Sequence, residues 1–325
     1  MSTAAPAIAF GPVPSRRLGR SLGINHIPPK SCSYACIYCQ VGPTPEPTLS
    51  RRAFYPPERV RDAVWARLAQ ARARGEPVDY LTFVPDGEPT LDEGLERAVE
   101  LLRPAGIPIA VISNGSLLWR PEVRRALAAA DWVSVKVDAV HEPVWRRLQR
   151  PHPDLTLDRV LAGVRRFAAE FPGTLASETM LVAGVNDGEG EVDAVAAFLE
   201  ALAPAVAYLA APTRPPAVAG VTGPDAAGIN RAYQVFSGRL PRVELLVGYE
   251  GDAFAASGDA AADLLAVTAV HPMRESAVRA LLERNGADWA VVERLLESGR
   301  LRRVAYRGES YYLRRPPVPG APAGD

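Results

Sequence analysis

The chain has 325 residues, 48% of them hydrophobic and 23% charged, a balance typical of a globular protein with one sizeable domain and a small one. Its 37 basic and 37 acidic residues cancel, so the net charge does not itself indicate a nucleic-acid partner. No apolar run approaches membrane-spanning length, and Met1 to Ala9 lacks the pattern of a signal peptide. We therefore expect a cytoplasmic protein with no membrane partner.

The charges are unevenly distributed along the chain. Before Glu46 there is no acidic residue, whereas several basic residues fall there, including Arg16, Arg17 and Lys30. Such a segment favours nearby anionic groups, although the two arginines could equally pair with surface carboxylates. Lys30 and Lys136 are the only lysines among the 37 basic residues, which suggests that these two positions need a compact point charge.

Helical and strand-like periodicities alternate along most of the chain. An extended segment and a first strand, ending at residues 24–27, precede a loop that contains cysteines. The apolar spacing then predicts helices at 58–74, 91–103, 122–130, 157–170, 189–203 and 225–237, and strands at 80–84, 107–113, 132–138, 175–182, 205–211 and 242–247. Repeated strand, helix, strand units build a parallel sheet with helices outside, so we predict an α/β fold. Its chemistry should lie at the carboxyl ends of the strands.

Every cysteine of the chain lies in one short segment, Ser-Cys-Ser-Tyr-Ala-Cys-Ile-Tyr-Cys-Gln, from residue 31 to residue 40. Thiolates gathered in this way suit a soft metal or an iron–sulfur cluster better than a disulfide. Cys32, Cys36 and Cys39 are one ligand short of a closed tetrahedral site, so a metal group held there keeps an open position. Two alternatives are a helix that buries the cysteines as small hydrophobes and a zinc site completed by His26.

The Cys-x3-Cys-x2-Cys spacing, with Tyr38 just before the last cysteine, resembles the signature of the radical S-adenosylmethionine (SAM) superfamily. The resemblance implies that Cys32, Cys36 and Cys39 hold a [4Fe–4S] cluster whose free iron binds SAM, and that Tyr38 packs against adenine. In that family an electron, supplied here by a flavodoxin or ferredoxin, cleaves SAM to a 5′-deoxyadenosyl radical that removes hydrogen from a substrate. The fold it implies is a partial, TIM-like (β/α)6 barrel over residues 1–250.

The segment after the second predicted strand of this alternation, Pro-Asp-Gly-Glu-Pro at residues 85–89, is similar to a second motif of the same family. In the family a Gly-Gly-Glu sequence holds the amino group of SAM, which would assign that role to Gly87 and Glu88. Asp86 stands where the motif has its first glycine, so the local geometry of the loop should differ. Read alone, Asp-Gly-Glu-Pro predicts only a turn.

Other polar residues lie at or near the ends of later strands. Ser113 and Asn114 are suited to ribose hydroxyls, although Asn-Gly is also a common turn, and the turn at Val185 resembles the adenine contact of the superfamily. Lys136 and Asp138 alternate with valines, so they face the barrel interior. They either pair with each other, which is the slightly favoured interpretation, or line the SAM or substrate pocket.

The substrate itself would need polar contacts in the barrel and at its mouth. The candidates are Arg16, Arg17, Asp138, Glu178 on the predicted fifth strand, and Arg214 in the proline-rich loop after the sixth. An arginine at the mouth could grip a phosphate or carboxylate of substrate, although a helix-capping or surface-pair role is as compatible with the sequence.

The end of the chain changes character. The pattern predicts a linker at 248–258, short helices at 260–268, 274–284 and 289–297, and a hairpin at 301–313. We expect a small winged-helix-like α+β domain at 259–315 and a disordered tail at 316–325. Six arginines between residues 300 and 315 face only Glu309, which favours a nucleic-acid contact, although winged helices also dock proteins.

The sequence therefore predicts a radical SAM enzyme with a single cluster, because no cysteine remains for a second one. Its Gly-Pro-Val-Pro-Ser-Arg-Arg-Leu-Gly and Pro-Thr-Arg-Pro-Pro segments resemble a bacterial radical SAM group related to the wyosine tRNA synthases, so modification of tRNA or other RNA is the leading hypothesis. One alternative is a glycyl-radical-enzyme activase that docks a partner protein through its C-terminal domain. Another is a winged-helix regulator whose metal site only senses redox state.

Overall fold

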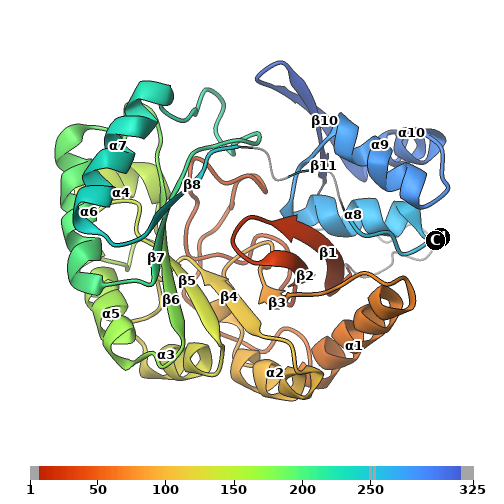
Figure 1. Ribbon diagram of the computed structural model, residues 1–325, viewed down its shortest axis with the longest axis horizontal. Helices are drawn as coiled ribbons and strands as arrows, with labels where there is room; N and C mark the ends of the chain where they lie inside the picture. Colours follow the sequence, from red (N-terminus) through yellow and green to blue (C-terminus); the bar gives the residue numbers. More distant parts are fainter. Residues whose placement is uncertain (1–6, 249–250, 252–253, 316–325) are drawn as a thin grey trace.

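The computed structural model describes residues 7–248, 251 and 254–315, and its main feature is a curled sheet of eight strands (Figure 1). In spatial order the strands are β1 (Ala9–Ser15), β2 (Gly19–Ile24), β3 (Tyr80–Phe83), β4 (Ile109–Ser113), β5 (Trp132–Lys136), β6 (Thr174–Met180), β7 (Val206–Ala210) and β8 (Val243–Leu246). From β2 onward all neighbours are parallel, whereas β1 runs antiparallel to β2. The predicted partial barrel corresponds to β2–β7, and β1 and β8 extend it at either edge.

Helices cover the outer face of this sheet, as Figure 1 shows. They are α1 (Pro57–Ala73), α2 (Leu95–Leu102), α3 (Pro121–Ala128), α4 (Glu142–Gln149), α5 (Leu157–Glu170), α6 (Glu189–Leu202) and α7 (Ala226–Arg239), with short 3-10 helices η1 (Pro89–Leu91) and η2 (Arg103–Ala105). Helix α4 was not predicted, because its polar sequence contains only one short apolar stripe that includes Val144, Trp145 and Leu148. In the described residues no helix is both long enough and apolar enough to cross a bilayer.

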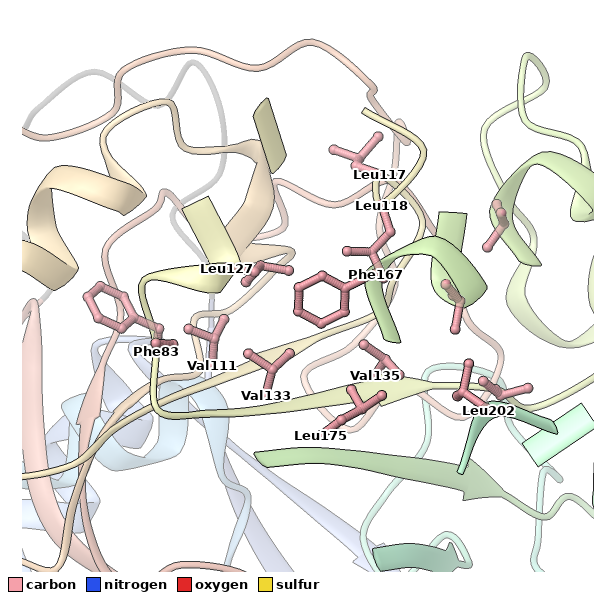
Figure 2. Packing of buried hydrophobic residues seen from close by; sticks show 14 of the residues in the cluster. Phe83, Val111, Leu117, Leu118, Leu127, Val133, Val135, Phe167, Leu175 and Leu202 are labelled. Atoms are coloured by element: carbon pink, nitrogen blue, oxygen red, sulfur yellow. The ribbon is translucent and has the colours of Figure 1, made fainter. Parts of the chain in front are cut away.

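The main core lies between the sheet and these helices. Val111, Val133 and Val135, from neighbouring strands, point toward Phe167 of α5, as Figure 2 shows. All four are almost completely buried, and each such side chain contributes about 1.5–3 kcal/mol to folding. The period-two alternation predicted for β5 is confirmed: its valines face the helices, and its polar residues face the barrel interior.

Residues 7–24 form more than the single strand that was predicted. β1 and β2 make an antiparallel hairpin, with a register shift between Phe10 and Val13. Pro12 and Pro14 suggested an extended segment outside the sheet, but β1 is an edge strand, where proline is tolerated because one side of the strand needs no ladder hydrogen bonds. The Phe10 ring lies over Gly23 of β2, where a Cβ atom would come within 2.0 Å of it.

The C-terminal elements follow in the predicted order of helices and hairpin. They are α8 (Ala260–Val270), β9 (Met273–Arg274), α9 (Glu275–Arg284), α10 (Ala290–Glu297), β10 (Leu301–Tyr306) and β11 (Glu309–Arg314). The sequence did not indicate β9, which is only two residues long and pairs with β11 to complete a three-stranded sheet. The predicted disordered tail, 316–325, lies outside the described residues.

The predicted linker at 248–258 is not a loose connection over its last part. Phe254, Ala255 and Ala256 are buried, and the Ala255 amide donates to the Pro12 carbonyl at 3.0 Å. Phe254 shares a hydrophobic cluster with Phe10 and α8, so these apolar residues pack against β1. The C-terminal elements are thereby held against the first strand of the barrel (Figure 1).

Candidate active site

The cysteine loop begins at the carboxyl end of β2, where the chain leaves the sheet. Backbone hydrogen bonds hold it from several sides: the Thr48 amide donates to the Cys32 carbonyl at 2.8 Å, and the Ile37 amide donates to Leu148 at 3.0 Å. All three cysteines are free and half-buried. The loop is irregular, with none of the helix that would bury the cysteines as hydrophobes, so that alternative is wrong.

Gly87 brings the next strand end against this loop. The Glu88 amide donates to the Ser31 carbonyl at 2.8 Å, and Ser31 and Gly87 form an isolated parallel bridge. A Cβ atom on Gly87 would lie 2.1 Å from the Ser31 carbonyl oxygen, so only glycine permits this approach. The motif that was predicted to bind cofactor therefore also fixes the residue just before Cys32.

Glu88 organises the end of β4. Its Oε1 atom accepts hydrogen bonds from the Ser113 hydroxyl at 2.7 Å and the Thr90 hydroxyl at 2.6 Å, and its Oε2 atom accepts from the Asn114 amide at 2.7 Å. Burial raises the pKa of this fully buried carboxyl, while those hydrogen bonds favour its charged form. The structure thus gathers Glu88, Ser113 and Asn114, but the carboxylate oxygens are already used within the protein.

Two nitrogen donors reach the cysteine sulfurs. The Asn114 side-chain amide lies 3.6 Å from the Cys32 Sγ atom and 2.9 Å from the Ser33 hydroxyl. On the other side of the loop, the Lys30 ammonium lies 3.6 Å from the Cys39 Sγ atom. Such contacts stabilise thiolates, which are the form of cysteine that binds metal.

The donor set fits an iron–sulfur cluster. Burial raises the pKa of the Cys32 thiol to about 12, and for Cys36 the neighbouring Cys32 and Cys39 add to the effect of burial. The three thiols therefore lie near enough to repel one another as thiolates, and a cationic metal group would relieve that repulsion. In a cubane each cysteine binds a different iron, so the three sulfurs need not converge on a single ion.

A zinc site completed by His26 has no support in the geometry. The His26 ring is fully buried, packs edge-on against Phe83 with 4.9 Å between ring centroids, and places its Nε2 atom 3.8 Å from an Asp92 oxygen. Across the residues with a described placement, no three histidine, cysteine, aspartate or glutamate side chains are grouped as ligands of one metal ion.

Acidification should destabilise the fold through His26. Burial lowers the pKa of His26 from 6.5 to about 4, so below pH 6.5 the unfolded chain binds a proton there that the folded chain does not. The contribution of neutral His26 to the free energy of unfolding is fully present above pH 6.5, and about 3 kcal/mol of it is lost as the pH falls to 4. Chemical denaturation at several pH values should show this extra loss in the wild type relative to His26→Gln. Equal pH dependence in the two proteins would contradict the assignment.

Asp138, which follows β5, binds Tyr38 of the cysteine loop. The Tyr38 hydroxyl donates a short hydrogen bond to Asp138, whose carboxylate also accepts from the Gln149 side chain at 2.9 Å and the Met180 amide at 2.7 Å. Lys136 forms its ion pair with Glu178 rather than with Asp138, so the pairing that the sequence slightly favoured is wrong. Burial lowers the pKa of Lys136, and the nearby charge of Asp138 opposes that shift. The carboxylate of Asp138 is held by these three donors instead.

Lys136 pairs across the sheet with Glu178 on β6. The Lys136 Nζ atom lies 2.5 Å from the Glu178 Oε1 atom, and the second carboxylate oxygen forms a short ion pair with Arg17 from the β1–β2 turn. The Lys136 ammonium also lies 5.4 Å from the centroid of the Tyr38 ring. Three candidate residues from distant parts of the sequence therefore meet in the barrel interior, next to the cysteine loop.

The remaining candidates divide between the site and the periphery. Val185 joins the apolar cluster that contains Tyr38 and packs near Cys36, so the predicted adenine contact lies at the site. The Arg16 side chain reaches from the β1–β2 turn to β8, where it donates at 3.5 Å to the Leu245 carbonyl. The basic segment that was expected around the cysteines is therefore divided, with Arg17 and Lys30 at the site.

Sequence reasoning missed a contact between the C-terminal elements and the cysteine loop. Arg214 donates at 2.7 Å to the side-chain oxygen of Gln40, the residue after Cys39, and lies 3.0 Å from the Nε2 atom of His271. Gln40 in turn donates to the Val270 carbonyl at 3.1 Å. Burial, and to a lesser extent the positive charge of Arg214, lowers the pKa of His271 well below its usual range. The His271 ring is therefore neutral and accepts the hydrogen bond from Arg214. No local sequence signal marks this contact, because its residues lie in three separate segments.

Comparison with known proteins agrees with this geometry. A family model described as the radical SAM superfamily matches residues 27–196, which include the cysteine loop, the Gly87 segment and strands β3 to β6. A protein described as UPF0026 protein MJ1312, from Methanocaldococcus jannaschii, is 43% identical over 309 residues, which cover 94% of this chain and 96% of the relative. A UPF0026 protein of Helicobacter pylori is 35% identical over 60% of this chain and 63% of its own.

Solved structures share the fold. A radical SAM methyltransferase from Sphaerobacter thermophilus superposes with a TM-score of 0.54 and 22% identity, covering 70% of this chain and 66% of the methyltransferase. This likeness concerns the arrangement of strands and helices rather than the reaction.

Proposed function

The chain belongs to the radical SAM superfamily, and from that premise we propose that it binds one [4Fe–4S] cluster and SAM and abstracts a hydrogen atom from its substrate. The observation that carries the proposal is the three-cysteine loop at the carboxyl ends of the strands, with nitrogen donors on two of its sulfurs. When bound, the cluster and SAM would supply a one-electron cleavage that yields the 5′-deoxyadenosyl radical. Membership of this superfamily also makes the protein a SAM-dependent enzyme.

The residues around the loop have distinct tasks in this proposal. Cys32, Cys36 and Cys39 would hold three irons and leave the fourth open to SAM. Tyr38 and Val185 present apolar surface for adenine, and Asp138 holds the Tyr38 ring in place through its hydroxyl. Glu88 would act by orienting Ser113 and Asn114 toward the cofactor rather than by binding its amino group directly.

The barrel interior would bind the substrate. Arg17 and Lys136 both bind the carboxylate of Glu178, so two cationic side chains lie together beside the cysteine loop. Two cationic side chains at this place favour a substrate with an anionic group, while the surrounding strands exclude water from the reacting atoms. Arg214, at the mouth, would contact the part of the substrate that extends outward.

Anaerobic reconstitution with iron and sulfide tests the proposed activity. The reduced wild-type protein with SAM should release 5′-deoxyadenosine, detected by mass spectrometry, whereas Cys36→Ala should release none. Failure of the wild type to hold iron or to release this product would favour the redox regulator. A SAM-dependent radical signal on a partner protein would instead favour the glycyl-radical activase.

We infer that the substrate is tRNA or another RNA, which would contact the β10–β11 hairpin. The Tyr306 and Tyr311 hydroxyls donate to the Pro212 and Thr213 carbonyls at 3.1 and 2.9 Å, so the hairpin stands beside the loop that carries Arg214. The arginines of this region are Arg300, Arg302, Arg303, Arg307, Arg314 and Arg315, and all but Arg314 are exposed. They support a winged-helix-like domain at 259–315 that binds phosphates, joined to a barrel at 1–250.

Charge reversal on the hairpin should weaken RNA binding. Arg303→Glu combined with Arg307→Glu should lower affinity for tRNA and reduce the slope of log affinity against log salt by about 1 for each arginine that contacts phosphate. Arg97→Glu is the matched control, because Arg97 is exposed on α2 and forms only a surface pair with Glu100. Equal binding by the two variants across a salt series would argue against an RNA contact on the hairpin.

The proposal also specifies a partner and a compartment. A flavodoxin or ferredoxin would provide the electron, and the reduced, unpaired cysteines are compatible with the cytoplasm.

A further inference from the structure

Lys30 connects two ends of the cysteine loop through its side chain. Its ammonium donates to the Gly42 carbonyl at 2.8 Å and lies 3.6 Å from the Cys39 Sγ atom. The side chain is only 9% exposed, so water screens this charge weakly. The cation therefore lies beside one of the three sulfurs that would carry the cluster.

The backbone at Lys30 adopts a conformation that lysine seldom takes. Its φ angle is +63°, in the left-handed region where glycine or asparagine is usual. Glycine would relieve this strain, yet one of the two lysines in an arginine-rich chain occupies the position. The side chain, rather than the backbone, thus explains the choice of residue.

Asp86 places a carboxyl beside the same ammonium, and because burial raises the pKa of this carboxyl to about 7, it carries its opposing negative charge above that pH. An Asp86 oxygen lies 3.8 Å from the Lys30 Nζ atom, and the carboxylate is almost completely buried. The two loops are also joined through the backbone, since the Lys30 amide donates to the Asp86 carbonyl at 2.7 Å. That hydrogen bond involves neither side chain, so either charge can be removed while the loops stay joined.

We propose that Lys30 is a positioning residue that raises the reduction potential of the cluster through its ammonium at Cys39, and that Asp86 moderates this effect. The inference rests on the proposed function. Reduction transfers one electron to the cluster from a one-electron donor of the flavodoxin or ferredoxin class, which is oxidised by one electron, and no bond forms or breaks. Because the added charge is negative, a fixed cation beside a ligand sulfur stabilises the reduced form more than the oxidised form.

The test is an anaerobic redox titration of the reconstituted full-length protein, carried out above pH 7 so that Asp86 is ionised and monitored by electron paramagnetic resonance without added SAM. Lys30→Met removes the charge at similar length, Lys30→Gly removes it and relieves the left-handed backbone, and Asp86→Asn removes the opposing charge. Arg97→Met is the control for a distant, exposed cation. Iron and sulfide are counted in every sample before titration.

Both Lys30 variants should shift the midpoint potential to more negative values, Asp86→Asn should shift it to more positive values, and Arg97→Met should leave it unchanged. Opposite shifts are the signature of charge, since a merely structural role would not change sign between the two positions. Unchanged potentials in fully loaded Lys30 variants, or a negative shift in Asp86→Asn, would overturn the inference. If Lys30→Met lost its iron, the direction in which Asp86→Asn shifts the midpoint potential would by itself decide whether the inference holds. A wild type without iron would instead refute the proposed function.

Discussion

A Gly87→Ala protein is expected to retain its barrel but to lose its iron and about a hundredfold in 5′-deoxyadenosine formation, the scale of loss that follows a 1 Å misplacement in a reacting site. The added Cβ atom would lie 2.1 Å from the Ser31 carbonyl oxygen and 2.9 Å from a methyl carbon of Ile27. The loops must separate, and the hydrogen bond from the Glu88 amide to Ser31 breaks. Cys32 then moves with Ser31.

Iron analysis, product formation and thermal unfolding together measure this effect. Gly190→Ala is the matched control, because Gly190 lies in α6 with no atom within 4 Å of its added Cβ. It should retain iron and gain about 0.5–1 kcal/mol in stability, since alanine favours helix more than glycine does. Full iron content in Gly87→Ala would show that the close approach is not required.

Replacing Glu178 with leucine should destabilise the protein by about 3–5 kcal/mol, the usual cost of breaking a buried ion pair by removing one partner. Glu178 is only 7% exposed, and its two oxygens bind the side chains of Arg17 and Lys136. The variant leaves both cations in the barrel without the carboxylate between them. Urea denaturation measures the change in the free energy of unfolding.

Two companion variants make that measurement decisive. Combining Glu178→Leu with Lys136→Met removes one of the two repelling cations and should recover part of the lost stability. Glu200→Leu, which removes the partner of an exposed pair with Arg239, should cost no more than about 1 kcal/mol. If Glu178→Leu lost as little free energy of unfolding as Glu200→Leu, water rather than the Glu178 carboxylate would be stabilising the two cations in the barrel.

Local patterns in the sequence were sufficient for the barrel and the cysteine loop. The period-two alternation of β5 and the helical spacing between strands predicted which faces are buried. Every strand from β2 to β7 ends near a residue that was singled out, because parallel strands place their carboxyl ends at one edge. These inferences required knowledge only of which residues follow each strand in the sequence.

Partners across strands could not be predicted in the same way. Whether Lys136 meets Asp138 or Glu178 depends on the register between β5 and β6, which places Lys136 opposite Glu178. The alternation along one strand predicts which face each side chain occupies, but it does not say which residue of the next strand lies opposite. The same reason explains why the contacts of Gln40 with Arg214, and of Arg214 with His271, were missed.

Edge strand β1 has a further consequence for how the chain acquires its structure. It pairs with β2 on one side, while Phe10 packs with α8 and the Pro12 carbonyl accepts a hydrogen bond from Ala255. β1 is therefore translated long before the residues from 254 onward that cover that side of it. Until then, the exposed edge of β1 can pair with strands of other nascent chains. Pro12 and Pro14 restrict such pairing, because proline has no amide hydrogen to donate.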